Sequence, residues 1–227
     1  MIIRRIFESD DFVLIDKLAG VLTTPSRFEE EDIRLCLGTA LQAEMKQQIY
    51  PVHRLDFEVS GLVMFAKNAE AHRQSNAWFE NKLVQKTYRA LTTPQDFSHI
   101  PANISNPRIT FEPKANETLH WKSQLLRGKK RTYESPQGKP SLTLAAFLGT
   151  TKDFLLWDLQ PVTGRPHQLR YELSRHGFPI VGDALYGSKV PFGENKIALR
   201  SYKIDFSKAP SAKAFGLPPA VEIEAEF

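Results

Sequence analysis

The sequence contains only one cysteine, Cys36, among its 227 residues. A single thiol cannot form an internal disulfide or a multi-cysteine metal site, and its scarcity favours a reducing compartment. The N-terminus has no long apolar core of the kind found in secretory signals. No apolar run approaches the ~20 residues that a membrane-spanning helix needs. These absences predict a cytoplasmic protein with no membrane partner.

Several well-known catalytic motifs are also missing. The sequence has no Walker phosphate-binding loop and no glycine-rich dinucleotide fingerprint. The stretch His53-Arg54-Leu55-Asp56 differs from a kinase catalytic loop, in which Arg and Asp are adjacent, and the other kinase motifs are absent. The six histidines include no pair at i, i+4 spacing, a common arrangement of metal ligands on a helix. We therefore expect neither phosphoryl transfer nor metal catalysis.

Positive charge is concentrated in one part of the chain. The net charge is +4, but the window from Trp121 to Pro140 contains six basic residues and one acidic residue, Glu134. The basic residues are Lys122, Arg127, Lys129, Lys130, Arg131 and Lys139. Such a block suits a polyanionic partner, although a solvated lysine-rich loop explains the same composition.

The pattern of apolar residues predicts an α+β fold with a mixed, mostly antiparallel β-sheet and a few flanking helices. Strands are expected around residues 12–22, 84–92, 142–148, 154–159, 197–206 and 221–227. Helices are expected from the acidic cluster at Glu29, from a cap at Asn68, and from Pro166. The segment from Pro94 to Pro140 is expected to form loops and edge strands that carry the basic block.

Two short stretches contain candidate functional residues. In the first, Asp56 lies close to Arg54 and just before a buried strand, where its environment can tune a carboxylate, although an ordinary loop ion pair gives the same pattern. In the second, Pro166 fits the first helical position and puts Arg165 at the N-cap. An arginine there opposes the positive end of the helix dipole and cannot cap the helix, which favours a functional role.

Four stretches together resemble the RluA family of pseudouridine synthases, in the order and spacing of that family. They are Val52-His53-Arg54-Leu55-Asp56 with Ser60-Gly61-Leu62, then Lys86-Thr87-Tyr88-Arg89-Ala90-Leu91, Gly138-Lys139-Pro140-Ser141-Leu142-Thr143, and Thr163-Gly164-Arg165-Pro166-His167-Gln168-Leu169-Arg170. The resemblance covers nearly the whole chain. It implies one catalytic domain over residues 1–227, in a short form without an extra N-terminal RNA-binding domain.

The resemblance also implies an activity and a set of site residues. The family isomerises specific uridines in structured RNA, rRNA or tRNA stem-loops, to pseudouridine after flipping the base, without a cofactor or metal. By this resemblance Asp56 is the nucleophile, attacking either C1′ of the sugar or C6 of the ring, and Arg165 keeps it ionised. Tyr88 stacks on the uracil and serves the later proton transfer. Arg54 fills the vacated stack and Arg170 faces RNA phosphates. Lys86 is a structural or phosphate-facing charge, and His53 is expected to be a satisfied structural histidine.

Two other functions remain open at this point. The first is an RNA-binding or ribosome-assembly protein that keeps the fold but performs no catalysis. The second is a hydrolase that cleaves the glycosidic bond with Asp56, but such enzymes commonly pair two carboxylates, and the only nearby acid is Glu58. The sequence suggests a monomer that needs no protein partner.

Overall fold

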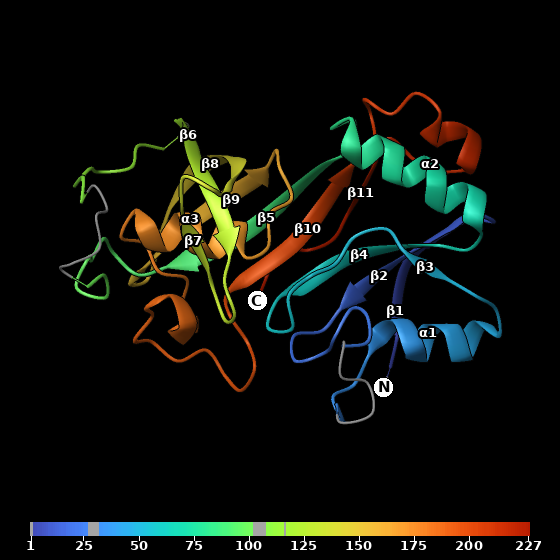
Figure 1. Ribbon diagram of the computed structural model, residues 1–227, viewed down its shortest axis with the longest axis horizontal. Helices are drawn as coiled ribbons and strands as arrows, with labels where there is room; N and C mark the ends of the chain where they lie inside the picture. The colour runs from blue at the N-terminus through green and yellow to red at the C-terminus, as the bar shows by residue number, and fades with distance from the viewer. Residues whose placement is uncertain (1, 27–31, 102–107, 116) are drawn as a thin grey trace. The chain divides into compact units, whose positions relative to one another are not determined.

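The computed structural model describes residues 2–26, 32–101, 108–115 and 117–227. The chain divides into two compact units (Figure 1). Unit 1 comprises residues 1–86 and 200–226, and unit 2 comprises residues 87–199 and 227. Unit 1 therefore contains Asp56, and unit 2 contains Tyr88 and Arg165. We describe each unit by itself.

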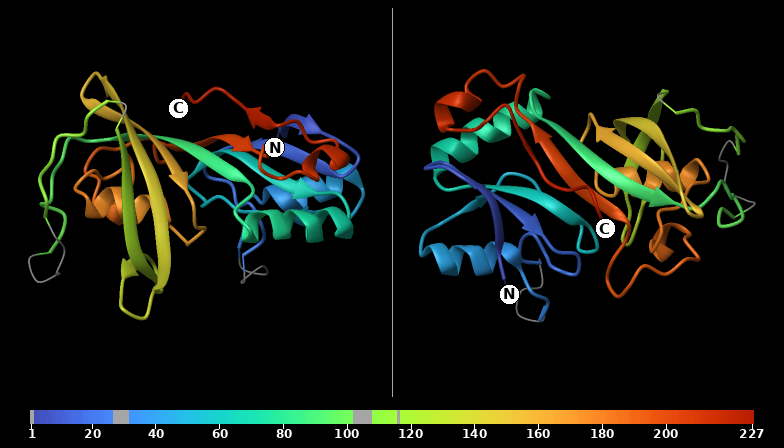
Figure 2. Two further views of the ribbon diagram at one scale, coloured as in Figure 1. Left: turned by 90° about the horizontal axis from the view of Figure 1, so that it is seen from above. Right: turned by 180° about the vertical axis from the view of Figure 1, so that it is seen from behind.

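Unit 1 is built on a β-sheet in which four strands have the order β1-β2-β4-β10. The short strands β3 and β11 pair with β4 and β10, respectively. The strands are β1 (Arg4–Glu8), β2 (Phe12–Lys17), β3 (Tyr50–Pro51), β4 (Ser60–Ala66), β10 (Leu199–Asp205) and β11 (Ala220–Glu222). All pairs are antiparallel except β4 with β10, which is parallel. Helix α2 (Ala69–Glu80), the teal helix of Figure 2, packs on the face of this sheet that carries Phe12, Leu14 and Met64. Helix α1 (Leu37–Met45) lies against the opposite face, where Gly38 approaches the Phe65 ring.

The core of unit 1 forms where alternate residues of the strands meet helix α2. Phe12, Leu14, Leu62 and Met64 are fully buried, and Trp78 of α2 packs with them. Helix α2 begins where the sequence predicts, because the Asn68 side chain accepts a hydrogen bond from the backbone N–H of Ala71. Among the helices in the described part of unit 1, α2 is the one whose first turn is capped by a side chain.

Unit 2 contains an antiparallel sheet with the strand order β5-β9-β8-β6-β7. The strands are β5 (Gln85–Thr92), β6 (Thr118–Arg127), β7 (Thr132–Glu134), β8 (Lys139–Thr151) and β9 (Phe154–Pro161). Helix α3 (Gln168–Arg175) packs against β7, β8 and β9, and the 3₁₀ turn η1 (Ala184–Tyr186) packs on α3. Leu169 and Leu173 of α3 are buried, as the sequence predicts. A second 3₁₀ turn, η2 (Ala212–Phe215), belongs to unit 1.

The α+β prediction with a mixed, mostly antiparallel sheet is therefore confirmed. The edge strands expected between Pro94 and Pro140 are also present, because β7 ends the strand order and β6, among the described residues, pairs with it only at residues 125–127. Two local predictions are wrong. Helix α1 begins at Leu37 rather than in the acidic cluster, of which residues 29–31 lie outside the described residues. Helix α3 begins at Gln168, so Arg165 lies in the preceding turn and not at the N-cap.

Candidate active-site residues

Asp56 lies in the turn that leads from β3 into β4. Leu55 and Val59, on either side of it, are buried, and the Val59 N–H donates to the Asp56 carbonyl oxygen at 3.1 Å. Asp56 itself is half-buried, and Arg54 is exposed. The two buried apolar residues anchor the turn in unit 1, so the carboxylate sits on a fixed piece of backbone beside a core strand.

The backbone on both sides of Asp56 is bound to one segment, residues 17–23. The Thr23 hydroxyl accepts from the Leu55 N–H at 3.1 Å and donates to the Leu55 carbonyl oxygen at 3.0 Å. The Phe57 carbonyl oxygen accepts from the Gly20 N–H at 2.9 Å and has a long contact of 3.5 Å with the Lys17 Nζ. These contacts restrict the main chain at the residues before and after Asp56.

Lys17 is a buried cation near the candidate nucleophile. Its side chain is 1% exposed, and its Nζ donates to the carbonyl oxygens of Leu18 (2.9 Å) and Val21 (2.8 Å). Burial lowers the pKa of Lys17 to about 8, and the negative charges of Asp56 and Glu58 oppose that shift. Sequence reasoning missed Lys17. The available signal was a lysine at the end of the apolar run that begins at Phe12, because a lysine in a buried strand needs partners.

Lys86 lies in a second cluster of unit 1, with His53 and Phe79. Its Nζ lies 5.4 Å from the centre of the Phe79 ring, and the His53 ring packs on the same phenyl ring at 5.6 Å. Burial lowers the pKa of Lys86 to about 8. Burial, with the nearby charge of Lys86, holds the pKa of His53 well below its ordinary value. The phosphate contact expected of Lys86 stays a prediction.

Within the described part of the chain, the His53 ring lacks the hydrogen bonds expected of a satisfied structural histidine. Both ring nitrogens are buried, and neither has a hydrogen-bond partner of normal geometry among the described residues. The ring instead packs on Phe79, and its neutral form avoids the larger cost of burying a charge.

In unit 2, Arg165 is held at two of its own groups. Its backbone N–H donates to the Gln168 Oε1 at 3.0 Å, and its Nε donates to the Pro140 carbonyl oxygen at 3.0 Å. Gln168 is 3% exposed and uses its whole amide: Oε1 also accepts from the Thr163 hydroxyl (2.8 Å), and Nε2 donates to the Leu142 carbonyl oxygen (3.0 Å) and the Thr143 hydroxyl (2.9 Å). The loop that carries Arg165 is thereby tied to strand β8.

Tyr88 and Arg170 are both buried in unit 2. Tyr88 lies in β5 opposite Leu159 and is 6% exposed. Arg170 is 2% exposed and forms a two-point ion pair with Asp183, at 2.7 and 2.9 Å, under the ring of Tyr186. The expectation that Arg170 faces phosphates is wrong, because its guanidinium is used to join α3 to the Asp183 turn. Asp183 is turn architecture, as the sequence suggested.

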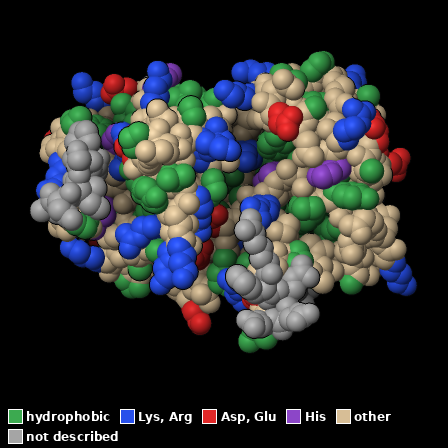
Figure 3. Space-filling view, in the orientation of Figure 1, with side chains coloured by type: hydrophobic (Ala, Val, Ile, Leu, Met, Phe, Trp, Pro, Cys, Tyr) green, Lys and Arg blue, Asp and Glu red, His purple; other side chains and the backbone are tan. Residues whose placement is uncertain are grey.

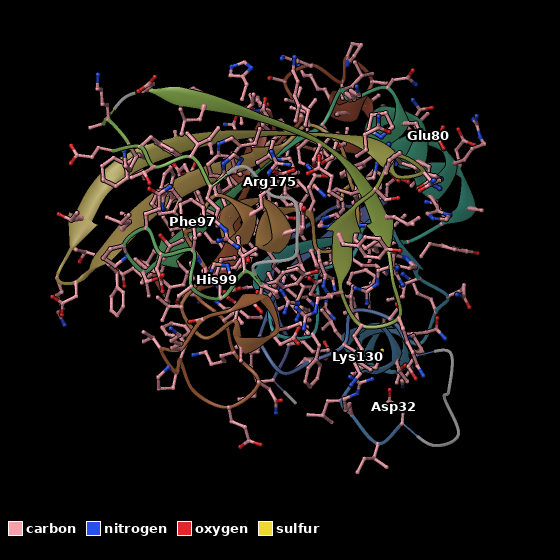
Figure 4. The ribbon with its side chains drawn as sticks, turned by 60° about the vertical axis from the view of Figure 1, so that its left-hand side comes forward. Asp32, Glu80, Phe97, His99, Lys130 and Arg175 are labelled. Atoms are coloured by element: carbon pink, nitrogen blue, oxygen red, sulfur yellow. The ribbon has the colours of Figure 1, made fainter. Side chains whose placement is uncertain are left out.

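The basic block forms an exposed surface on the β6–β7 hairpin and the start of β8. All six of its lysines and arginines are exposed. Figure 3 shows Lys and Arg side chains on the face of unit 2 that carries this hairpin. Lys130 lies at the hairpin tip (Figure 4), where the Arg127 Nη1 donates to its carbonyl oxygen at 3.0 Å and also lies 3.3 Å from the His167 Nδ1. The block is therefore surface charge on a regular strand pair.

Comparison with known proteins identifies the family. Residues 11–175 match the family model described as RNA pseudouridylate synthase. The chain belongs to the RNA pseudouridylate synthase family. The matched range includes the turn with Asp56, strand β5 with Tyr88, and the loop with Arg165.

Individual relatives support this assignment. An uncharacterized RNA pseudouridine synthase from Helicobacter pylori strain J99 is 36% identical over 187 residues, which cover 81% of this chain and 58% of that protein. The dual-specificity RNA pseudouridine synthase RluA from Vibrio vulnificus is 32% identical, covering 88% of this chain and 76% of that protein. The chain thus spans less than two thirds of the length of the Helicobacter relative.

The fold also matches solved structures. Human RNA pseudouridylate synthase domain containing 4 superposes with a TM-score of 0.67 at 18% identity, covering 97% of this chain and 88% of that one. Human RNA pseudouridylate synthase domain containing 1 gives a TM-score of 0.65 at 23% identity, covering 90% and 78%. At these identities the likeness is one of fold.

Among the described residues, no group of three or more His, Cys, Asp or Glu side chains could hold a metal ion. None of the described helices has both the length and the apolar character of a membrane span.

Proposed function

We propose that this protein is an RNA pseudouridine synthase that isomerises uridine in structured rRNA or tRNA. The observation that supports it most is the family match, which covers the turn with Asp56 and the loop with Arg165. The relatives are named for action on RNA in general, on tRNA and on the large ribosomal subunit. The assignment of residues 1–227 to one catalytic domain stays a prediction.

In the proposed mechanism Asp56 is the nucleophile. Its carboxylate attacks C1′ or C6 of a flipped uridine, the bond between N1 and C1′ breaks, and the uracil turns within the pocket. A bond then forms between C5 and C1′, the bond from the Asp56 carboxylate to C1′ or C6 breaks, C5 loses its proton, and N1 gains one, so the carboxylate is regenerated and no atom is gained or lost overall. Tyr88 stacks on the uracil and serves the proton transfer from C5, and Arg165 supplies the positive charge that keeps the carboxylate ionised.

RNA binding in this proposal relies on exposed charge. Arg54 is exposed beside the turn that carries Asp56, where it can occupy the stack that the flipped uridine leaves. The exposed basic residues of the β6–β7 hairpin contact phosphates, which makes affinity depend on salt. Lys86 is a candidate for another phosphate contact. Monomeric state, independence of a protein partner and a cytoplasmic location stay predictions.

The direct test is pseudouridine formation by the purified protein on ribosomal and transfer RNA, measured after complete digestion. Asp56→Asn removes the nucleophilic charge at nearly constant volume, and we expect product formation to fall at least ~10³-fold, a loss of about 4 kcal/mol of transition-state stabilisation. Asp153→Asn, on an exposed turn of unit 2, is the matched control and should keep wild-type activity.

Three outcomes separate this proposal from its rivals. Equal product from the wild type and from Asp56→Asn excludes Asp56 as the nucleophile. RNA binding without product on any RNA favours a protein that binds but does not catalyse. Release of free uracil favours a glycosidic hydrolase, in which Glu58 would be the second carboxylate.

A further inference from the structure

Thr23 makes an unusual pair of hydrogen bonds to a single residue, Leu55. Its hydroxyl accepts from the Leu55 N–H at 3.1 Å and donates to the Leu55 carbonyl oxygen at 3.0 Å. Thr23 is 3% exposed and Leu55 is 7% exposed, so water does not replace these bonds easily. One side chain thus satisfies both main-chain groups of the residue immediately before Asp56.

The backbone of Thr23 is itself fixed by the start of helix α1. The Thr23 carbonyl oxygen accepts from the Gly38 N–H at 3.1 Å, and the adjacent Leu22 carbonyl oxygen accepts from the Leu37 N–H at 2.8 Å. The approach is close, because a Cβ atom on Gly38 would lie 3.0 Å from the Thr23 carbonyl oxygen. The hydroxyl therefore extends from a rigid point of unit 1.

The residue after Asp56 is bound to the same segment. The Phe57 carbonyl oxygen accepts from the Gly20 N–H at 2.9 Å. With Leu55 held by Thr23 and Phe57 held by Gly20, the backbone dihedrals around Asp56 have little freedom. The direction in which the Asp56 side chain leaves the turn is set by that backbone.

We propose that Thr23 is a positioning residue that aims the Asp56 carboxylate through its two bonds to Leu55. The inference depends on the proposed function, in which Asp56 is the nucleophile. Covalent attack needs the reacting atoms about 3–3.5 Å apart and aligned, and a misplacement of ~1 Å costs on the order of 10²-fold in rate. Thr23 contributes no atom to the reaction, so its loss should reduce the rate of the chemical step and not RNA binding.

The test uses three variants of the full chain in single-turnover assays with excess enzyme. Thr23→Val keeps the shape and removes both bonds, and we expect the rate constant to fall about 10- to 100-fold with RNA affinity within about 2-fold of wild type. Thr23→Ser retains the hydroxyl and should recover at least half of the wild-type rate. Gly38→Ala forces the Thr23 carbonyl oxygen to shift while the Thr23 side chain is kept. We expect this variant to lower the rate constant by a smaller factor, a few-fold.

A matched control separates catalysis from stability. Thr92 is fully buried in unit 2, and its hydroxyl accepts from the Trp157 Nε1 at 2.9 Å. Thr92→Val also leaves a buried N–H without its partner, so it should lower the melting temperature while the rate constant stays at the wild-type value. If Thr23→Val is too unstable to assay, Gly38→Ala and Thr23→Ser carry the test.

The outcomes distinguish this inference from the proposed function. If Asp56→Asn is inactive while Thr23→Val and Gly38→Ala react as fast as Thr92→Val, the positioning role is overturned and the proposed function survives. Failure of Thr23→Ser to recover the rate would also overturn it, because the hydroxyl would then not be the group that matters. If Asp56→Asn is as active as the wild type, Asp56 is excluded as the nucleophile, and the catalytic role on which this inference depends is refuted.

Discussion

The loop that carries Asp56 in unit 1 and the loop that carries Arg165 in unit 2 are held in different ways. Around Asp56 the side chain of Thr23 and the N–H of Gly20 bind the main chain of its neighbours, Leu55 and Phe57, and the Asp56 carbonyl oxygen accepts from the Val59 N–H. Arg165 is held at its own backbone N–H by Gln168 and at its own Nε by the Pro140 carbonyl oxygen.

The chemistry of the two side chains explains the difference. A carboxylate that acts as a nucleophile needs its oxygens for the substrate, and fixing the adjacent backbone is one way to orient it. A guanidinium has five N–H donors, and giving one to a carbonyl oxygen leaves four for an anion. In both units the anchor is a buried polar side chain, Thr23 or Gln168, that satisfies main-chain groups of a loop.

The largest further effect should come from the anchor in unit 2. Gln168→Glu removes the two amide donors and buries a carboxyl group against the Leu142 carbonyl oxygen. We expect the free energy of unfolding to fall by about 2–4 kcal/mol and the single-turnover rate to fall at least ~10-fold. Chemical denaturation and the pseudouridine assay measure the two effects.

Gln95→Glu is the matched control for this change. Gln95 also uses its whole amide in unit 2, accepting from the Phe111 N–H and donating to the carbonyl oxygens of Ile109 and His176, but it does not contact the Arg165 loop. Equal rates for Gln168→Glu and Gln95→Glu would show that the bond to the Arg165 backbone has no role in catalysis.

An intermediate effect should appear as a pH dependence from Lys17 in unit 1. The pKa of Lys17 is about 8 in the folded chain, compared with an ordinary value of 10.5 that applies to the unfolded chain. Between pH 8 and pH 10.5 the unfolded chain therefore binds more protons than the native chain. The free energy of unfolding contributed by Lys17 should therefore rise with pH across this window, by at most about 3 kcal/mol. Activity should change in the opposite direction above pH 8, because the ammonium near Asp56 is lost.

Lys17→Met isolates this contribution, and Lys208→Met, on an exposed loop of unit 1, is its control. Between pH 7 and about 10.5, the difference in free energy of unfolding from wild type should change with pH for Lys17→Met but not for Lys208→Met. Parallel stability curves for the wild type and Lys17→Met would contradict a depressed pKa at this position.

The smallest effect should come from single surface charges of unit 2. Lys130→Ala should weaken RNA binding a few-fold at low salt and reduce the slope of log affinity against log salt by about 0.7–0.9, with the rate constant unchanged. Lys114→Ala, exposed in unit 2 but outside the basic block, is the control. A salt slope unchanged by Lys130→Ala would remove the hairpin tip from the RNA-binding surface.

The sequence could predict the features of the fold that depend on local signals. Local signals succeeded: the Asn68 cap predicted the start of α2, and alternation predicted β5. Alternation was also present in β6, where Trp121, Ser123 and Leu125 are buried, but the prolines and lysines around it masked the signal.

Interactions between residues far apart in the chain could not be predicted from the sequence. Arg170 finds its partner Asp183 thirteen positions later, and the loop of Arg165 is closed by the amide of Gln168 rather than by an N-cap. Thr23 gave no signal at all, because a threonine in a loop is chemically ordinary until its hydroxyl meets Leu55, 32 positions later. The residue types of the candidate site could be predicted, but the anchors that hold them could not.

The proposed site is tested most directly by a crystal structure of the Asp56→Asn variant bound to a uridine-containing RNA substrate. We expect the side chain at position 56 and the guanidinium of Arg165 to flank the same flipped uracil, within about 4 Å of each other, with the Tyr88 ring against the base. A structure in which positions 56 and 165 lie on separate surfaces, with no shared pocket, would contradict it.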